Sequence, residues 1–196
     1  MIAVIDYKAG NLTSVMKALN ALNVAATITE DPDQVSKASK VILPGVGHFA
    51  ATRLLRERGL SDAVKDSIDR GIPFLGICVG LQWLFEGSTE SPENEGLGIF
   101  SGMCERFPVG AKVPHVGWNS VSVRTGSRLL ANVSEGEFVY YTHSYRAPVI
   151  KDTAAVTEYG EAFTGAVERD NVMGVQFHPE KSGVAGMQIL RNFVEL

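Results

Sequence analysis

The chain of 196 residues is 45% hydrophobic and 20% charged, and its formal net charge is −4. This length suits one domain, residues 1–196, and the acidic balance does not favour binding to nucleic acid or anionic membranes, which calls for a clustered basic face. No stretch approaches the run of about 20 apolar residues that spans a bilayer, and the first apolar run stops at Asp6, unlike a signal peptide. Cys78 and Cys104 do not suggest a disulfide framework. We therefore expect a cytoplasmic protein with neither a nucleic-acid nor a membrane partner.

The first half of the chain alternates between short β-branched apolar runs and segments with helical spacing of apolar residues. The runs predict strands at 2–6, 25–30, 40–47 and 72–77, of which 2–6 and 40–47 are expected to be buried. The spaced segments predict helices at 10–22, 49–70 and 79–87. Asn11 is the expected N-cap of the first helix, Pro32 opens a further short helix, and Gly87 closes the helix at 79–87. This alternation indicates parallel βαβ units.

The pattern changes after a polar loop at 87–98. Strand-like runs then dominate, a hairpin turns near Asp170 and Asn171, and the last segment, 182–196, returns to a helix. The runs lie at 102–107, 116–123, 137–147, 153–159 and 163–177. We predict an α/β fold with a mostly parallel central sheet flanked by helices and an antiparallel β extension in the C-terminal half.

The stretch "PFLGICVGLQ" places Cys78 between Gly76 and Gly80, where a predicted strand gives way to a helix. Strand–G-x-C-x-G–helix has the form of a nucleophile elbow, with cysteine in the place of serine. Such a turn lifts the thiol to the carboxyl end of the strands, sets it at a helix N-terminus that favours thiolate, and aims the Val79 N–H into the site. The alternative is a plain buried cysteine in a glycine-tolerant turn. Cys104 lacks these features and is expected to be packing.

A thiolate nucleophile needs an imidazole to move protons and a group to hold that imidazole. In "GVQFHPEKS", His178 ends an apolar strand and Glu180 lies two residues on, so both side chains are expected on one side of the backbone. The alternative is a strand-ending His-Pro with a solvated Glu180. The spacing of the histidines and cysteines matches no metal site, and we expect no cofactor.

Six stretches, spread in this order along the chain, carry a resemblance to a known family: "DYKAGNL", "LPGVGHF", "GICVGLQWLFEGSTE", "VPHVGWN", "YYTHSY" and "GVQFHPEKSG". The chain resembles the class I, triad-type, glutamine amidotransferases, and within them it is most similar to the glutaminase subunits of imidazole glycerol phosphate synthases, because relatives that serve other synthases carry a different loop in place of "PGVG". One departure is Lys8, which stands where the family opening usually has glycine. The resemblance implies a flavodoxin-like fold and a single glutaminase domain over residues 1–196.

The resemblance also implies roles for particular residues. Cys78 would attack the amide of glutamine to form a thioester, His178 would move the protons, and Glu180 would orient His178. The N–H of Val79 and a second N–H at Val46 or Gly47, exposed by a peptide flip, would bind the oxyanion. The residues expected to line the glutamine site are Gly45, Gln82, Glu90, His143, Ser144 and Tyr145. From the residues alone, a solvated carboxylate is the favoured interpretation of Glu90, and the alternative for "PGVG" is an ordinary strand-ending turn.

The implied partner is a separate (β/α)₈-barrel cyclase subunit, joined to this chain as a heterodimer. It would use the ammonia to make imidazole glycerol phosphate and aminoimidazole carboxamide ribonucleotide in histidine biosynthesis. The residues that match partner-facing positions of the family are Asn11, Trp118, Tyr140 and Lys181, although Trp118 reads equally as core. Two other classes of function remain open: a free-standing cysteine hydrolase, such as a γ-glutamyl peptidase, and a non-catalytic α/β binding module.

Overall fold

One sheet of nine strands runs through the protein. The structure, a computed structural model, describes residues 1–196, and the strand order is β2-β1-β3-β4-β12-β11-β10-β7-β8. The parallel strands are β1 (Ile2–Ile5), β2 (Ala26–Thr29), β3 (Lys40–Gly45), β4 (Phe74–Cys78) and β12 (Val172–Val175). β1, β3, β4 and β12 are short, apolar and mostly buried, which is typical of a parallel sheet covered on both faces, whereas the edge strand β2 is partly exposed.

The antiparallel extension continues the same sheet. It consists of β11 (Ala162–Arg169), β10 (Thr153–Glu158), β7 (His115–Val123) and β8 (Glu137–His143). The predicted hairpin joins β11 to β12 with Arg169 opposite Val172, and Asp170 in the turn has a φ of 51°. A small second sheet contains β5 (Gly87–Ser88), β6 (Met103–Arg106) and β9 (Tyr145–Arg146). The predicted fold class is therefore confirmed.

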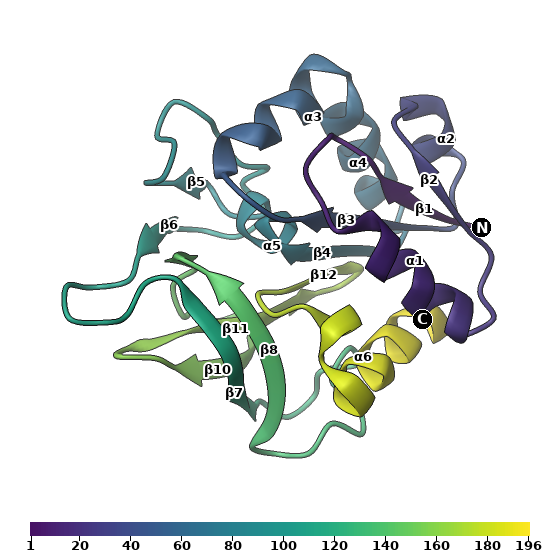
Figure 1. The fold of residues 1–196 in the computed structure, drawn as a ribbon. Helices are drawn as coiled ribbons and strands as arrows, with labels where there is room; N and C mark the ends of the chain where they lie inside the picture. The colour runs from purple at the N-terminus through teal and green to yellow at the C-terminus, as the bar shows by residue number, and fades with distance from the viewer.

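Helices cover both faces of the parallel strands (Figure 1). On one side lie α2 (Pro32–Ser36), α3 (Arg53–Glu57) and α4 (Leu60–Asp69), and on the other α1 (Leu12–Ala21) and α6 (Gly183–Glu195) lie together. The short α5 (Val79–Trp83) follows β4, and two 3₁₀ turns, η1 (Phe49–Thr52) and η2 (Pro179–Lys181), complete the set. No helix combines the length and apolar character that a membrane crossing requires.

Three local expectations differ from the structure. Asn11 occupies the N-cap position of α1, but its side chain makes no capping hydrogen bond. The helical segment 49–70 is interrupted at Gly59, whose φ of 72° lies in the left-handed region. The helix after Cys78 ends at Trp83, and Gly87 lies in β5 instead of closing that helix.

Both halves of the chain share one hydrophobic cluster. Val4 and Leu75 from the parallel strands belong to the same buried group as Tyr141 and Phe163 from the antiparallel strands. Because β4 and β12 are parallel neighbours at the centre of the sheet, residues about 100 positions apart in the chain meet at their carboxyl ends.

Candidate active site

Cys78 lies on a tight turn between β4 and α5. Its φ of 55° and ψ of −107° are unusual for a residue with a side chain, and holding such a conformation costs about 1–3 kcal/mol. The flanking glycines make the turn possible. A Cβ at Gly76 would lie 2.4 Å from the Gly80 carbonyl oxygen, and a Cβ at Gly80 would lie 2.1 Å from that of Leu43.

The space beside the glycines of this turn is occupied by backbone of α5 and β3. The thiol itself is buried, with Cys78 only 2% exposed.

His178 and Glu180 form a buried pair beside the cysteine turn. Val175 of β12 pairs with Ile77 of β4, so the segment that follows β12 emerges next to Cys78. His178 Nδ1 lies 2.9 Å from Glu180 Oε1, and both side chains are 1% exposed. This burial rules out a solvated Glu180. His178 Nε2 and Glu180 Oε2 have no hydrogen-bond partner in the protein.

Two opposing effects act on the pKa of His178. Burial, the largest single influence, lowers it, but the interactions with Cys78 and Glu180 together outweigh burial and raise the pKa to about 9. Pairing with Glu180 thus favours the imidazolium form, which can donate a proton to a leaving group.

The side-chain amides of Gln176 and Gln82 link Cys78 to the backbone carbonyl of Tyr145 by hydrogen bonds. Gln176 Nε2 donates to Cys78 Sγ at 3.6 Å, and Gln82 Nε2 donates to Gln176 Oε1 at 3.1 Å and to the Tyr145 carbonyl at 2.8 Å. The thiol itself points to the Thr142 carbonyl at 3.9 Å. Sequence reasoning missed Gln176 and Thr142. The available signal for Gln176 was a polar residue inside the apolar strand that leads to His178.

A pocket of about 200 Å³ opens beside Cys78. This volume is below the roughly 300–1,000 Å³ of pockets for drug-sized ligands and suits a ligand of amino-acid size. The pocket is lined by Gly47, Cys78, Val79, Gln82, Glu90, Pro114, Thr142, His143, Ser144 and Tyr145. The structure thus brings together five of the six residues expected to bind substrate, along with Gly47 and Val79.

Gly45 is the expected substrate residue that does not line the pocket. It is buried at the end of β3, opposite Cys78 in the sheet, and a Cβ there would lie 2.6 Å from Tyr7 Oη and 2.7 Å from Val79 Cβ. Val46 also lies outside the lining, whereas Gly47, with a φ of 97°, reaches it. The turn after β3 therefore runs directly alongside the cysteine turn.

His143 has a supporting role in this structure. Its Nδ1 lies 2.8 Å from the Tyr145 carbonyl, and its Nε2 lies 3.1 Å from His115 Nδ1. Burial, as the largest influence, lowers the pKa of His143 to about 3 and that of His115 to about 4. Both rings are therefore neutral, and the chain of hydrogen bonds holds the turn at Ser144 and Tyr145 against the pocket.

Glu90 fastens the polar loop to the turn after β3. Its Oε2 accepts a hydrogen bond from the Phe49 N–H at 2.8 Å, while the carboxylate also lines the pocket. At the other side, both hydrogens of the Gln82 amide are donated, which leaves Gln82 Oε1 as an acceptor. The pocket therefore holds two oxygen acceptors that can bind an ammonium group.

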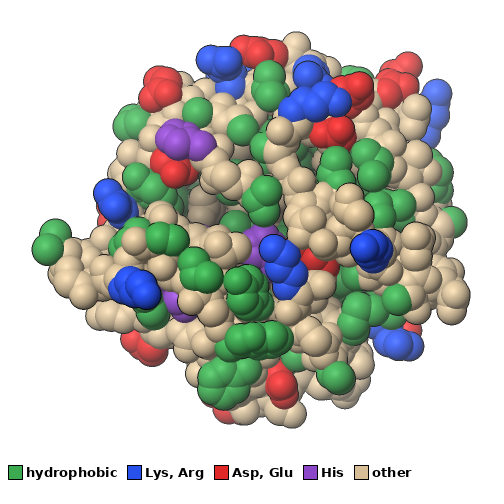
Figure 2. All heavy atoms as spheres, viewed as in Figure 1, with side chains coloured by type: hydrophobic (Ala, Val, Ile, Leu, Met, Phe, Trp, Pro, Cys, Tyr) green, Lys and Arg blue, Asp and Glu red, His purple; other side chains and the backbone are tan.

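An apolar patch lies on the outer face of β7 and β8. We call Val116, Trp118, Phe138 and Tyr140 the outer patch; three of them are more than half exposed, Trp118 at 55%. Trp118 pairs with Tyr140 across the strands with ring centroids 6.0 Å apart, and Lys181 Nζ lies 5.9 Å from the Tyr140 ring. Apolar side chains gather over these strands in the lower part of Figure 2. Trp118 is thus a surface residue and not core.

The site combines a cysteine, a buried histidine–glutamate pair and a pocket of amino-acid size, all at the carboxyl edge of a parallel sheet. These features define an α/β protein with a Cys-His-Glu triad. The sequence profile of the family described as glutamine amidotransferase class-I matches residues 3–196. The chain belongs to the class-I glutamine amidotransferase family.

Within that family, the chain is similar over its full length to subunits of one kind of synthase. The chain is 47% identical to the imidazole glycerol phosphate synthase subunit HisH of Thermococcus kodakarensis, covering 100% of both chains. It is 46% identical to the protein of the same name from Caldanaerobacter subterraneus, covering 100% of this chain and 98% of the relative. A solved structure described as a glutamine amidotransferase superimposes with a TM-score of 0.78 at 20% identity, covering 100% of this chain and 98% of that chain, which supports the fold.

Proposed function

We propose that the chain hydrolyses L-glutamine to L-glutamate and ammonia at Cys78 and passes the ammonia to a separate synthase subunit in histidine biosynthesis. The observation that carries the catalytic part is the buried His178–Glu180 pair beside Cys78 at a pocket of amino-acid size. The full-length similarity to subunits of imidazole glycerol phosphate synthase supports the choice of pathway. Residues 1–196 act as a single glutaminase domain without a cofactor.

The reaction uses the thiolate–imidazolium form of the site. The Cys78 thiolate attacks the side-chain amide carbon of glutamine, and the His178 imidazolium gives its proton to the leaving nitrogen, so that ammonia departs and a γ-glutamyl thioester remains. Water then attacks the thioester as His178 Nε2 takes its proton. The carbon–sulfur bond breaks, glutamate leaves, and the ion pair is restored. Glu180 holds Nδ1 and stabilises the imidazolium throughout.

Substrate recognition comes from the pocket walls. Gln82 Oε1 and the Glu90 carboxylate accept hydrogen bonds from the α-ammonium group of glutamine, and the turn at His143, Ser144 and Tyr145 lies along its other side. The Val79 N–H and an N–H of the turn at Val46 and Gly47 bind the oxyanion. Loss of one such donor lowers the rate by about 10²–10³.

The acceptor of the ammonia is a (β/α)₈-barrel cyclase that forms a heterodimer with this chain. The outer patch, together with Lys181 and the start of α1 at Asn11, is the docking surface we propose for it. Exposed aromatic residues are enriched at protein interfaces and depleted from ordinary surface. The patch also lies on the strand β8 that ends at His143, so docking there is close to the pocket.

The first test measures glutamate release from glutamine. The wild type is assayed alone and with the cyclase and the cyclase substrate, beside Cys78→Ala and the matched variant Cys104→Ser. A large rise on addition of both components, abolished by Cys78→Ala and retained by Cys104→Ser, is expected. High activity without a partner would instead indicate a free-standing hydrolase, and no activity in any mixture would leave a binding module.

A further inference from the structure

One buried hydroxyl near the site is unexplained by the mechanism above. Three buried side-chain polar atoms lack a hydrogen-bond partner, and two of them, His178 Nε2 and Glu180 Oε2, belong to the triad. The third is Tyr7 Oη, on a residue that is fully buried. An unpaired buried donor is costly, so native proteins rarely leave one without a reason.

The Tyr7 hydroxyl lies beneath the junction of the two oxyanion segments. A Cβ placed on Gly45 would be 2.6 Å from Tyr7 Oη and 2.7 Å from Val79 Cβ, so the hydroxyl faces the Cα of Gly45 close to the start of α5. Burial, and secondarily the charge of Cys78, raises the pKa of Tyr7. The phenol therefore remains protonated and is a donor without an acceptor.

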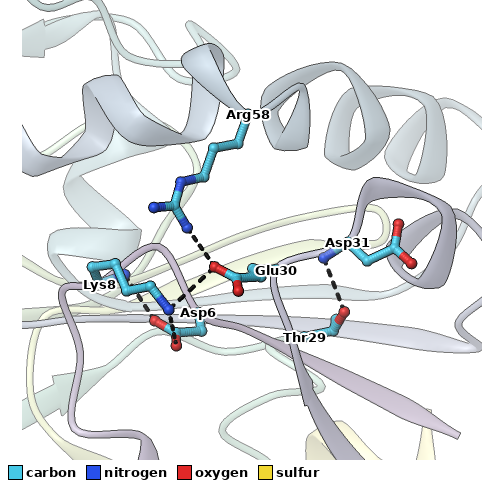
Figure 3. A network of polar contacts seen from close by, with 6 residues as sticks. All are labelled: Asp6, Lys8, Thr29, Glu30, Asp31 and Arg58. Carbon is cyan, nitrogen blue, oxygen red and sulfur yellow. Dashed lines mark hydrogen bonds and ion pairs between the residues drawn. The ribbon is translucent and has the colours of Figure 1, made fainter.

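The turn that carries Tyr7 is held from both sides. Its neighbours Asp6 and Lys8 form an ion pair at 3.2 Å, Lys8 Nζ also lies 3.1 Å from Glu30 Oε2, and Arg58 Nη1 lies 2.6 Å from the same oxygen (Figure 3). The backbone of Lys8 takes a φ of 67°, and its N–H donates to Asp6 Oδ1 at 2.7 Å. Because Tyr7 is fully buried, its hydroxyl has little room to move, and an acceptor must come to it.

The turn after β3 can supply that acceptor. Rotation of the Gly45–Val46 peptide reverses the directions of its C=O and its N–H together. A glycine before the peptide makes this rotation easy. The carbonyl that moves is bonded to the Cα that Tyr7 faces. The N–H that moves belongs to Val46, beside the pocket lined by Gly47 and Val79.

We propose that Tyr7 is a positioning residue for the oxyanion turn: its hydroxyl donates to the Gly45 carbonyl when the Gly45–Val46 peptide rotates, which holds the Val46 N–H in the pocket. The inference rests on the proposed glutaminase function. In the arrangement of this structure the hydroxyl is unpaired, and in the rotated arrangement it is satisfied. One hydrogen bond formed only after rotation shifts the balance toward the active arrangement by about tenfold.

The test is Tyr7→Phe, which removes only the hydroxyl. We expect opposite effects on stability and activity. The Tm of the free chain rises by about 2–4 °C because an unsatisfied buried group is gone. The partner-stimulated kcat falls about tenfold, with the KM for glutamine unchanged because Tyr7 does not touch the substrate. The matched control for stability is Tyr141→Phe, which breaks a 2.6 Å hydrogen bond to Thr157 and lowers Tm.

Each other outcome has a distinct meaning. A raised Tm with unchanged kcat overturns the positioning role, and a lowered Tm in Tyr7→Phe means that the hydroxyl is already bonded in the free chain. A KM increase without a change in kcat would assign Tyr7 to substrate binding. If the wild type shows no partner-stimulated glutamate release, the proposed function itself fails, and the inference falls with it.

Discussion

Gly80→Ala tests whether close packing of α5 on β3 sets the geometry of the cysteine turn. The added Cβ would lie 2.1 Å from the Leu43 carbonyl oxygen and 3.2 Å from its carbon, and Cβ contacts below 3.0 Å essentially do not occur. Because the obstacle is backbone in a central strand, the start of α5 must move by roughly 1 Å. We expect the free energy of unfolding to fall by about 1–3 kcal/mol, the range for overpacked sites.

The same displacement moves Cys78 and the Val79 N–H relative to His178. A misplacement of about 1 Å at a reacting group can cost about 10²-fold in rate, so kcat should fall by about that factor. Urea unfolding and partner-stimulated glutamate release measure the two effects. Gly10→Ala is the milder comparison, because its nearest contact, the Pro44 carbonyl oxygen at 3.3 Å, requires a shift of only a few tenths of an ångström, and its cost should stay below about 1 kcal/mol. If Gly80→Ala unfolds at the wild-type urea concentration, the packing argument is wrong.

Three further predictions follow from the site and the surface. Glu180→Gln should lower the pKa of His178 and reduce kcat by at least about 10²-fold, visible as a shifted pH–rate profile; an unchanged profile would contradict the pairing. Acid should destabilise the fold through His115 and His143, whose pKa values are lowered, because the unfolded chain takes up protons below about pH 6.5 while the folded chain does not. The free energy of unfolding from urea titrations should therefore fall from pH 7 to 5, by at most about 1.4 kcal/mol per pH unit for each ring, and a flat response would mean that the rings are protonated when folded. Trp118→Ala should weaken cyclase binding by about 10–100-fold in titration calorimetry without changing Tm by more than a few degrees; unaltered affinity would place the interface elsewhere.

The main architecture was readable from the sequence because the relevant signals are local. The β-branched runs of the first half predicted the parallel strands β1 to β4, and glycine beside cysteine at a strand end predicted the turn at Cys78. The sequence placed β12 only in the antiparallel extension, whereas it also pairs in parallel with β4. His178 and Glu180, two residues apart, were predicted to meet, and the structure places them 2.9 Å apart. Their catalytic roles remain predictions.

Contacts between distant segments were not readable. The helix after Cys78 ends at Trp83 because the carbonyls of Trp83 and Phe85 accept hydrogen bonds from the N–H groups of Leu97 and Gly98, in the polar loop. Nothing local to residues 79–87 encodes that competition. The same holds for Gln176, which reaches Cys78 from 98 residues away.

The sequence by itself determined the elements, their order and the residue types at the turn and the strand end. Only the tertiary structure decided which backbone fills the space beside Gly76 and Gly80, that the thiol and the Glu180 side chain are buried, and that the Tyr7 hydroxyl lies beside Gly45 without a partner. The physical reason is that propensity and periodicity act over a few residues, whereas burial and hydrogen-bond satisfaction depend on which segments the sheet brings together.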